Sequence, residues 1–272
     1  MGPERVDAVD AVDAVDAVDA GDVPEEGADT PRVAVPIVVA TYNVHQCVGS
    51  DGRRDPARIA DVIRETKADV IALQEVDSRT GVEHGVDQFN FLAEATEMRP
   101  IAGPTLQDHR GHYGNAILTR MSVLRQRSLD LSVPGREPRG ALDVVLTAAG
   151  HELRMIATHL GLRWRERRRQ VATLVDLIGT ESREPLVLLG DMNEWIPIRH
   201  SLAPLFQMLG HPPRRRTFPA HRPLLPLDRI WCRPSEAVSS IHVHRSERAR
   251  IASDHLPLKA EVRLGGTERS PG

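Results

Sequence analysis

Four polar residues that can bind a cation or move a proton each come directly after a short apolar run: Asn43, Glu75, His159 and Asp191. Short runs of this kind predict buried strands, so the four side chains would stand at strand ends. Ligands of open α/β sheets gather beyond strand ends, because the backbone there is rigid and side chains are free to converge. The pattern predicts a site of hard oxygen ligands with an imidazole beside it.

Each of these four residues also has a plainer structural explanation when it is taken alone. Asn43 suits a turn, and Asp191 suits a turn or a helix N-cap. Glu75 alone would be a surface charge, and His159 alone would be a structural histidine hydrogen-bonded near a strand end. The prediction therefore depends on the whole set.

A second group of candidates lies further along the chain. Asp254 and His255 are adjacent just before the last apolar run, so a carboxylate can hold a metal beside an imidazole. Asp228 supplies another carboxylate that can orient the ring, and Asn193 supplies a donor. Metal-assisted hydrolysis needs a cation, a group that orients water and donors for the developing charge, and these residues provide all three.

The elements that position these residues follow from apolar runs and helical periodicity. Strands are predicted at 33–41, 70–73, 116–119, 142–146, 153–158, 186–189, 228–231, 239–244 and 258–264. Helices are predicted from Asp55-Pro56 onward and at 88–97, 164–178 and 201–209. Strands alternate with helices, but Ala149-Gly150 marks a hairpin, so one α/β domain with mixed sheets is expected over residues 32–266.

The two ends of the chain are predicted to be disordered. Residues 6–20 are five copies of Val-Asp-Ala, a period of three that gives no apolar face to a helix or a strand. We therefore expect an acidic, disordered tail at 1–31 and a short one at 267–272. The first 30 residues hold ten acidic residues and one arginine, so the net charge of −3 leaves a mildly basic body that suits an anionic substrate.

Composition limits the class of protein. No apolar run approaches the roughly 18 residues of a membrane span, and no basic start precedes an apolar run as in a secretory signal. Cys47 and Cys232 cannot form a disulfide framework and have no metal-site spacing, which predicts free thiols and a cytoplasmic protein. A monomer is expected.

Seven short segments resemble, in order, successive blocks of the endonuclease/exonuclease/phosphatase superfamily of metal-dependent phosphoesterases. They are Thr-Tyr-Asn-Val-His at 41–45, Leu-Gln-Glu-Val at 73–76, Tyr-Gly-Asn-Ala-Ile-Leu-Thr-Arg at 113–120, Thr-His-Leu at 158–160, Gly-Asp-Met-Asn at 190–193, Leu-Asp-Arg-Ile at 227–230 and Ser-Asp-His-Leu-Pro-Leu at 253–258. The resemblance covers about residues 35 to 264. It implies a four-layer α/β sandwich of two packed mixed β-sheets flanked by helices, with the site at one edge.

The resemblance also implies ligands for the cation and the substrate. Glu75 resembles the main Mg²⁺ ligand, with Asn43 and Asp254 beside it, and Mn²⁺ is the alternative cation. Asn115, in the third block, is expected to contact the substrate. Arg139, in the loop 135–140, is a second candidate contact, for which an ordinary surface arginine in a turn is the alternative.

The remaining roles concern the attacking water and the phosphate. Asp191 resembles the carboxylate that orients or deprotonates the water, and Asn193 resembles a phosphate-holding donor. His255, held by Asp228, is similar to the essential histidine of the family. His159 takes a position whose residue contacts phosphate or assists the leaving group. Either Asp191 or His255 can be the base, and we favour Asp191 polarising water while a charged His255 stabilises the phosphorane oxygens.

Three hypotheses for the function stay open at this level. The first is a Mg²⁺-dependent hydrolase of a small-molecule or lipid-headgroup phosphoester. The second is a DNA or RNA nuclease, suggested by arginine clusters at 163–169 and 214–216, although these also suit a solvated face in an arginine-biased chain. The third is a phosphate-binding member that lost turnover, which is disfavoured because every catalytic position is filled.

Overall fold

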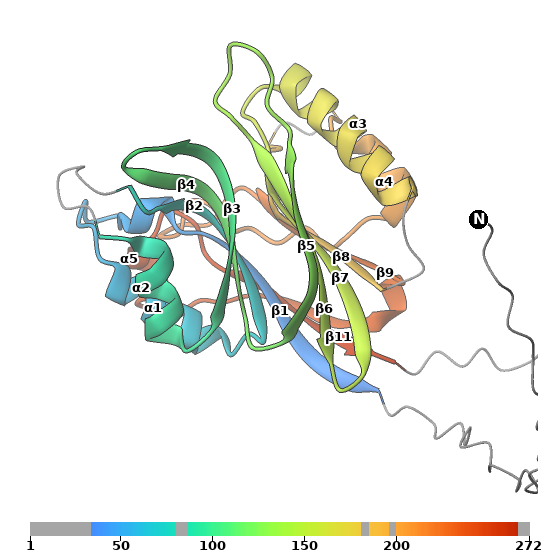
Figure 1. The fold of residues 1–272 in the computed structure, drawn as a ribbon, viewed down its shortest axis with the longest axis horizontal. Coiled ribbons are helices and arrows are strands. Elements are labelled where there is room, and N and C mark those ends of the chain that lie inside the picture. Colours follow the sequence, from blue (N-terminus) through green and yellow to red (C-terminus); the bar gives the residue numbers. More distant parts are fainter. Residues whose placement is uncertain (1–33, 80–85, 181–184, 196–199, 266–272) are drawn as a thin grey trace, which may run out of the picture. The chain divides into compact units, whose positions relative to one another are not determined.

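The computed structural model describes residues 34–79, 86–180, 185–195 and 200–265 (Figure 1). The tails expected at 1–31 and 267–272 lie outside these residues, as does Val33, the predicted start of the first strand. The described residues form two β-sheets with helices on their outer faces.

The first sheet has six strands within the described residues, in the order β10-β11-β1-β2-β4-β3. These strands are β1 (Val35–Asn43), β2 (Val70–Asp77), β3 (Arg99–Asp108), β4 (Gly111–Thr119), β10 (Val238–Val243) and β11 (Leu258–Leu264). β1 and β2 run parallel, whereas the other neighbouring pairs are antiparallel. This sheet is therefore mixed, as the sequence predicted.

The second sheet has five strands in the described part of the chain, in the order β5-β6-β7-β8-β9. They are β5 (Ser122–Asp130), β6 (Gly140–Ala148), β7 (His151–His159), β8 (Leu186–Asp191) and β9 (Asp228–Arg233). Only β7 and β8 run parallel among these pairs. Each sheet thus contains one parallel pair whose carboxyl ends lie at the same edge.

The helices lie on the outer faces of the two sheets. They are α1 (Pro56–Thr66), α2 (Gln88–Thr96), α3 (Trp164–Thr180), α4 (Ala203–Leu209) and α5 (Ala249–Ala252), and short 3₁₀ turns form at η1 (His45–Cys47) and η3 (Ser235–Ala237). α1 begins as the sequence predicted, because the Asp55 side chain accepts the Arg58 N–H at 3.0 Å ahead of Pro56.

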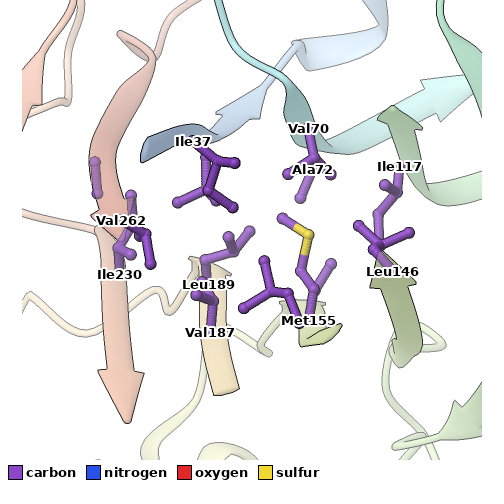
Figure 2. Packing of buried hydrophobic residues seen from close by; sticks show 14 of the residues in the cluster. Ile37, Val70, Ala72, Ile117, Leu146, Met155, Val187, Leu189, Ile230 and Val262 are labelled. Carbon is purple, nitrogen blue, oxygen red and sulfur yellow. The ribbon is translucent and has the colours of Figure 1, made fainter. Parts of the chain in front are cut away.

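Three apolar clusters divide the structure into layers. Ile37 of β1 and Val187 of β8 belong to a cluster between the sheets, and Figure 2 shows Val70 and Ala72 of β2 facing Met155 of β7 within it. A second cluster joins the first sheet to α1, α2 and α5, and a third joins the second sheet to α3 and α4 (Figure 1). Both faces of each sheet are covered, which confirms the predicted four-layer α/β sandwich and explains the continuous apolar runs of the central strands.

Two strands were not predicted, β3 and β5, and both are edge strands of their sheets. β3 contains Pro100 and Pro104, which a central strand would exclude because proline cannot donate to the ladder. β5 is largely exposed, with Leu124 54% exposed, so it lacks an apolar run. The other predicted strands and helices are present with ends shifted by a few residues.

Among the described residues, no helix combines the length and the apolar character needed to cross a bilayer.

Candidate active site

Strand ends from both sheets meet at one edge of the sandwich. β1 ends at Asn43 in the first sheet, and β7 and β8 end at His159 and Asp191 in the second. The register places His159 beside Asp191 and Asp191 opposite Asp228, the first residue of β9. The strand-end pattern in the sequence therefore corresponds to a real convergence of side chains.

Glu75 reaches this edge because β2 is irregular. The pairing of β2 with β4 shifts register between Leu73 and Val76, and both of these residues pack in the same helix-side cluster. Residues three apart can share one face of a strand only if an extra residue is inserted, as in a β-bulge. Glu75 carries that irregularity with a φ of 59°, a conformation that costs energy for a non-glycine residue and is typical of functional sites.

Asn43 joins the carboxylates of the two sheets. Its Nδ2 donates to Glu75 Oε1 at 2.9 Å and to Asp191 Oδ2 at 3.2 Å. Its own backbone carbonyl accepts the hydroxyl of Ser253 at 2.8 Å, which ties the segment before β11 to the end of β1. Asp254 is thereby held near Asn43 and Glu75.

His255 lies between two carboxylates. Its Nδ1 is 2.9 Å from Asp228 Oδ2, and its Nε2 is 3.5 Å from Asp191 Oδ2. Burial alone would lower the pKa of His255, but Asp228, Asp191 and Asp254 raise it from 6.5 to about 10. Thr217 donates its hydroxyl to Asp228. The Phe218 ring packs against the imidazole of His255, with 4.9 Å between the ring centres. The geometry therefore favours an imidazolium at neutral pH.

His159 has the opposite environment. Arg139 Nη1 lies 3.0 Å from His159 Nδ1, and because a guanidinium only donates, Nδ1 must accept and the neutral ring carries its proton on Nε2. Nε2 is 3.6 Å from Asp191 Oδ2, the acceptor that faces its proton. Asn193 Nδ2 also lies 3.1 Å from Nε2, but it is a donor itself and donates to the Leu160 carbonyl at 2.9 Å. Burial and the Arg139 charge lower the pKa of His159 to about 3. His159 is thus a neutral donor aimed at Asp191.

These side chains line a cleft of about 590 Å³. Most of the site residues predicted from the sequence belong to it: Asn43, Glu75, Arg139, His159, Asp191, Asn193, Asp254 and His255. Asp228 lies behind His255, fully buried, and Asn115 lies outside the lining, with its Nδ2 donating to the Gly140 carbonyl at 3.0 Å. Arg139 is only 6% exposed, so the alternative of an ordinary surface arginine is wrong.

Comparison with known proteins identifies this arrangement. Residues 40–255 match the Endonuclease/Exonuclease/phosphatase family. The chain belongs to this family. It is also 32% identical over 244 residues to Uncharacterized protein YbhP of Escherichia coli (strain K12), an alignment that covers 83% of this chain and 96% of that protein.

Solved structures of the endonuclease/exonuclease/phosphatase family share the fold. A member from Beutenbergia cavernae superposes with a TM-score of 0.68 at 26% identity, over 85% of this chain and 72% of that one. A mannosyl-6-phosphatase from Bacteroides thetaiotaomicron superposes with a TM-score of 0.67 at 18% identity, over 83% and 99% of the two chains. At 18% identity, the similarity to the mannosyl-6-phosphatase shows a shared fold alone.

The endonuclease/exonuclease/phosphatase family consists of phosphoesterases that typically depend on a divalent metal. Among the described residues, no cluster of three or more His, Cys, Asp or Glu side chains has metal-site geometry. The donor set at the cleft is two carboxylates with an amide, and Mg²⁺ suits such a set because it keeps several waters. In the described part of the chain, Glu75 Oε2 and Asp254 Oδ2 accept no hydrogen bond, so both remain able to ligate. The residues present fit the cation.

The cleft contains residues that the sequence did not single out. Tyr113 opens the third sequence block, and Glu137 forms an ion pair with Arg139 at 2.9 Å. Burial and the neighbouring Glu75 raise the pKa of the Tyr113 hydroxyl, which is therefore a neutral donor. The one sequence signal for Tyr113 was its position in the third block, two residues before Asn115. Phe218 lies in a loop, and nothing in the sequence marked it.

Proposed function

We propose that this member of the family hydrolyses a small-molecule or lipid-headgroup phosphoester by attack of an activated water, with Mg²⁺ as its cation. The observation that carries the proposal is the position of Asp191 Oδ2. This one oxygen lies 3.2 Å from Asn43 Nδ2, 3.6 Å from His159 Nε2 and 3.5 Å from His255 Nε2. A buried carboxylate with an amide and two imidazoles around one oxygen can orient a water and take its proton.

The two histidines support a division of labour around Asp191. His255, positively charged over the ordinary pH range, is poorly suited to accept a proton and well suited to stabilise negative charge on the phosphorane oxygens. Neutral His159 can donate its Nε2 proton to a phosphate oxygen or to the leaving group. Asp191 is then the base, which is the assignment we favour.

Glu75, Asn43 and Asp254 would hold the cation. When bound, Mg²⁺ neutralises phosphate charge and polarises the P–O bond, and Mn²⁺ can take its place in many such sites. Asn193 and Arg139 face the same space and are positioned to bind the remaining phosphate oxygens, with Arg139 supplying a fixed positive charge.

The form of the cleft favours a small phosphoester over a nucleic acid. Arg139 is the one arginine that lines the cleft among the described residues. Proteins that grip DNA or RNA contact several successive phosphates along a basic track. The Arg214–Arg216 cluster lines neither this cleft nor the cavity beside it, whereas Arg163 and Arg169 line that neighbouring cavity and not the cleft.

A substrate panel tests the proposal. The purified protein is incubated with Mg²⁺ or Mn²⁺ and a generic phosphodiester, a phosphomonoester, phospholipids, and single- and double-stranded DNA, each with a chelator control. We expect chelator-sensitive hydrolysis of the small esters or lipids, and loss of at least about a hundredfold in Asp191→Asn. Strong nicking of DNA would instead support the nuclease hypothesis, and no turnover of any substrate would support a binding protein.

The folding state of the variant must be known for this result to count. Asp191→Asn retains an oxygen that can accept the Asn193 N–H, which Asp191 Oδ1 accepts at 2.9 Å. Its thermal midpoint should therefore stay within a few degrees of the parent value. A variant that melts normally and still turns over at the parent rate would remove Asp191 from the mechanism.

A further inference from the structure

A second cavity, of about 540 Å³, lies beside the cleft and is rich in arginine. We call it the arginine cavity, and its lining includes Arg136, Arg163, Arg165, Arg169, Trp164 and Trp195. Leu162 and Trp195 line both the cleft and the arginine cavity, so a single ligand can extend from one to the other. Arg165 and Arg169 lie in the first turns of α3, and Arg163 comes directly before it.

The arginine cavity carries positive charge that the described residues leave uncompensated. Arg136, Arg163, Arg165 and Arg169 are exposed, and no carboxylate among the described residues forms an ion pair with them. Elsewhere on the surface some exposed arginines are paired, as Arg110 is with Asp108, whereas others, such as Arg214 and Arg222, form no ion pair with a described carboxylate. Glu166 is the one acidic side chain in the lining, and it is buried and accepts the Arg163 backbone N–H. The arginine cavity is distinguished by the gathering of four such arginines around one space.

Arg167 has a different part in this region. It is 1% exposed, and it donates to Glu194 at 3.3 Å and to the Leu162 carbonyl at 2.8 Å. Its guanidinium also lies 5.5 Å from the centre of the Trp195 ring. Arg167 is therefore a positioning residue that holds both residues shared by the two cavities.

The shared boundary is apolar on its surface. Leu162 is 56% exposed, and Trp195 is half-buried beside it, so the two side chains offer an apolar surface between the cavities. A carbon skeleton lying on these two side chains would place one anionic group in the cleft and another among the arginines. The region therefore suits a ligand in which an apolar linker joins two anionic groups.

We propose that the arginine cavity binds a second phosphate of the substrate, so that this protein prefers organic bisphosphates over monophosphates. This inference rests on the proposed function for the identity of the reacting group, but the second phosphate is recognised by the arginines independently of turnover. Guanidinium groups bind phosphate through paired, charge-assisted hydrogen bonds, which are among the stronger polar contacts in proteins.

The arginine cavity favours a compact bisphosphate over a nucleic acid strand. Guanidinium groups already cover the tryptophan rings, with Arg165 and Arg168 at 5.7 Å and 5.3 Å from the Trp164 ring centre. Base stacking would need those faces. The four unpaired arginines also line one cavity.

Calorimetry with a matched pair of ligands tests the proposal. Fructose 1,6-bisphosphate and fructose 6-phosphate differ by one phosphate and are titrated into the full chain with Mg²⁺ at an ionic strength of about 0.15 M, which screens long-range charge. We expect the bisphosphate to bind about tenfold or more tightly. The double variant Arg163→Gln with Arg169→Gln should reduce this preference to about twofold or less.

Arg168→Gln is the matched control, since Arg168 lies on the same helix with the same charge but outside the arginine cavity. It should keep the preference. Equal binding of the two ligands, or equal loss in Arg168→Gln and in the double variant, would overturn the proposal. So would a double variant that loses affinity for a short oligothymidylate but not for the bisphosphate, because the cavity would then bind nucleic acid.

Two further experiments are needed. One separates a lipid headgroup from a free bisphosphate as the ligand, and the other separates bisphosphate binding from the proposed hydrolysis. Phosphatidylcholine vesicles with and without phosphatidylinositol 4-phosphate show whether the bisphosphate is a lipid headgroup, and loss of that binding in the double variant supports the same cavity chemistry. Asp191→Asn should abolish hydrolysis and keep the bisphosphate preference. If the parent protein prefers the bisphosphate but hydrolyses no substrate, the arginine cavity is supported and the proposed hydrolysis is rejected. If it hydrolyses a substrate but shows no preference for the bisphosphate, the proposed hydrolysis is supported and the arginine cavity is rejected as a phosphate site.

Discussion

Nδ1 of His255 lies 2.9 Å from Oδ2 of Asp228, and both side chains are buried at the inner end of the cleft. Asp228 is the first residue of β9, and its Oδ2 also accepts the hydroxyl of Thr217. It touches no open space in the cleft, so its effect on the reaction must pass through the imidazole. The pair makes two predictions possible, one for stability and one for activity.

Asp228→Asn should change how stability depends on pH. The folded-state pKa of His255 is about 10, above its ordinary 6.5, so the imidazolium contributes fully to the free energy of unfolding below pH 6.5. That contribution is lost as the pH rises through about 10. Urea unfolding of the parent and of Asp228→Asn should therefore show the largest difference below pH 6.5 and a shrinking difference up to pH 10.

The same variant should change the activity profile. With the carboxylate removed, the pKa of His255 falls, and the alkaline limb of kcat moves to lower pH. His255→Gln provides the comparison, because it has no ring to titrate and should lack this limb. An alkaline limb that stays in place in Asp228→Asn would show that His255 does not act as a cation.

Arg139→Met should change both the tautomer and the pKa of His159. Burial and Arg139 lower this pKa from 6.5 to about 3, so the neutral ring adds stability above pH 6.5 that is lost as the pH falls toward 3. Without the guanidinium the pKa of His159 should rise, while burial still holds it down. Nitrogen-detected NMR of the ring should show the proton on Nε2 in the parent protein. A proton on Nδ1 would contradict the contact with Arg139 Nη1.

Much of this fold can be predicted from the sequence because its central strands are covered on both faces. Val39 and Ala40 are neighbours in β1 that pack in different clusters, so both are apolar, and the same holds for the run in β8. β3 and β5 escape prediction because an edge strand needs fewer apolar residues and tolerates proline or alternating polar residues.

The site is predictable to the extent that it is built from strand ends. Asn43 and Asp191 lie where strands end, and local sequence marks that position. Tyr113 and Phe218 reach the cleft through the register of β4 and the path of a loop, which depend on tertiary packing. Whether Arg139 is buried or exposed, and whether α3 begins beside the cleft, are likewise set by how distant segments pack.

Glu75→Gln should weaken the response to metal more than it weakens the fold. Glutamine keeps an oxygen for Asn43 Nδ2, which Glu75 Oε1 accepts at 2.9 Å, but it removes the negative charge that attracts a hard cation. The Mg²⁺ concentration for half-maximal activity should rise by about tenfold or more, with a smaller change in melting temperature. Glu94→Gln on α2, an exposed position with the same charge change, should leave the titration unchanged. An unchanged titration in Glu75→Gln would exclude Glu75 as a ligand.

Gly190→Ala should disable the site through the backbone. Gly190 precedes Asp191 in β8 with a φ of 144°, and an added Cβ would lie 1.8 Å from the Thr158 carbonyl oxygen of β7. The two strands must then separate where they present His159 and Asp191, so activity should fall at least about a hundredfold even where the protein still folds. Gly150→Ala is the matched control, because Gly150 also has a positive φ of 77° but no atom within 4 Å of the new Cβ. Its cost should be limited to backbone strain, roughly 1–2 kcal/mol. Urea unfolding and kcat of both variants separate the two effects. Equal losses of kcat in the two variants would mean that backbone strain alone matters. A greater loss of kcat in Gly190→Ala would show that the close approach of β7 and β8 sets the geometry around Asp191.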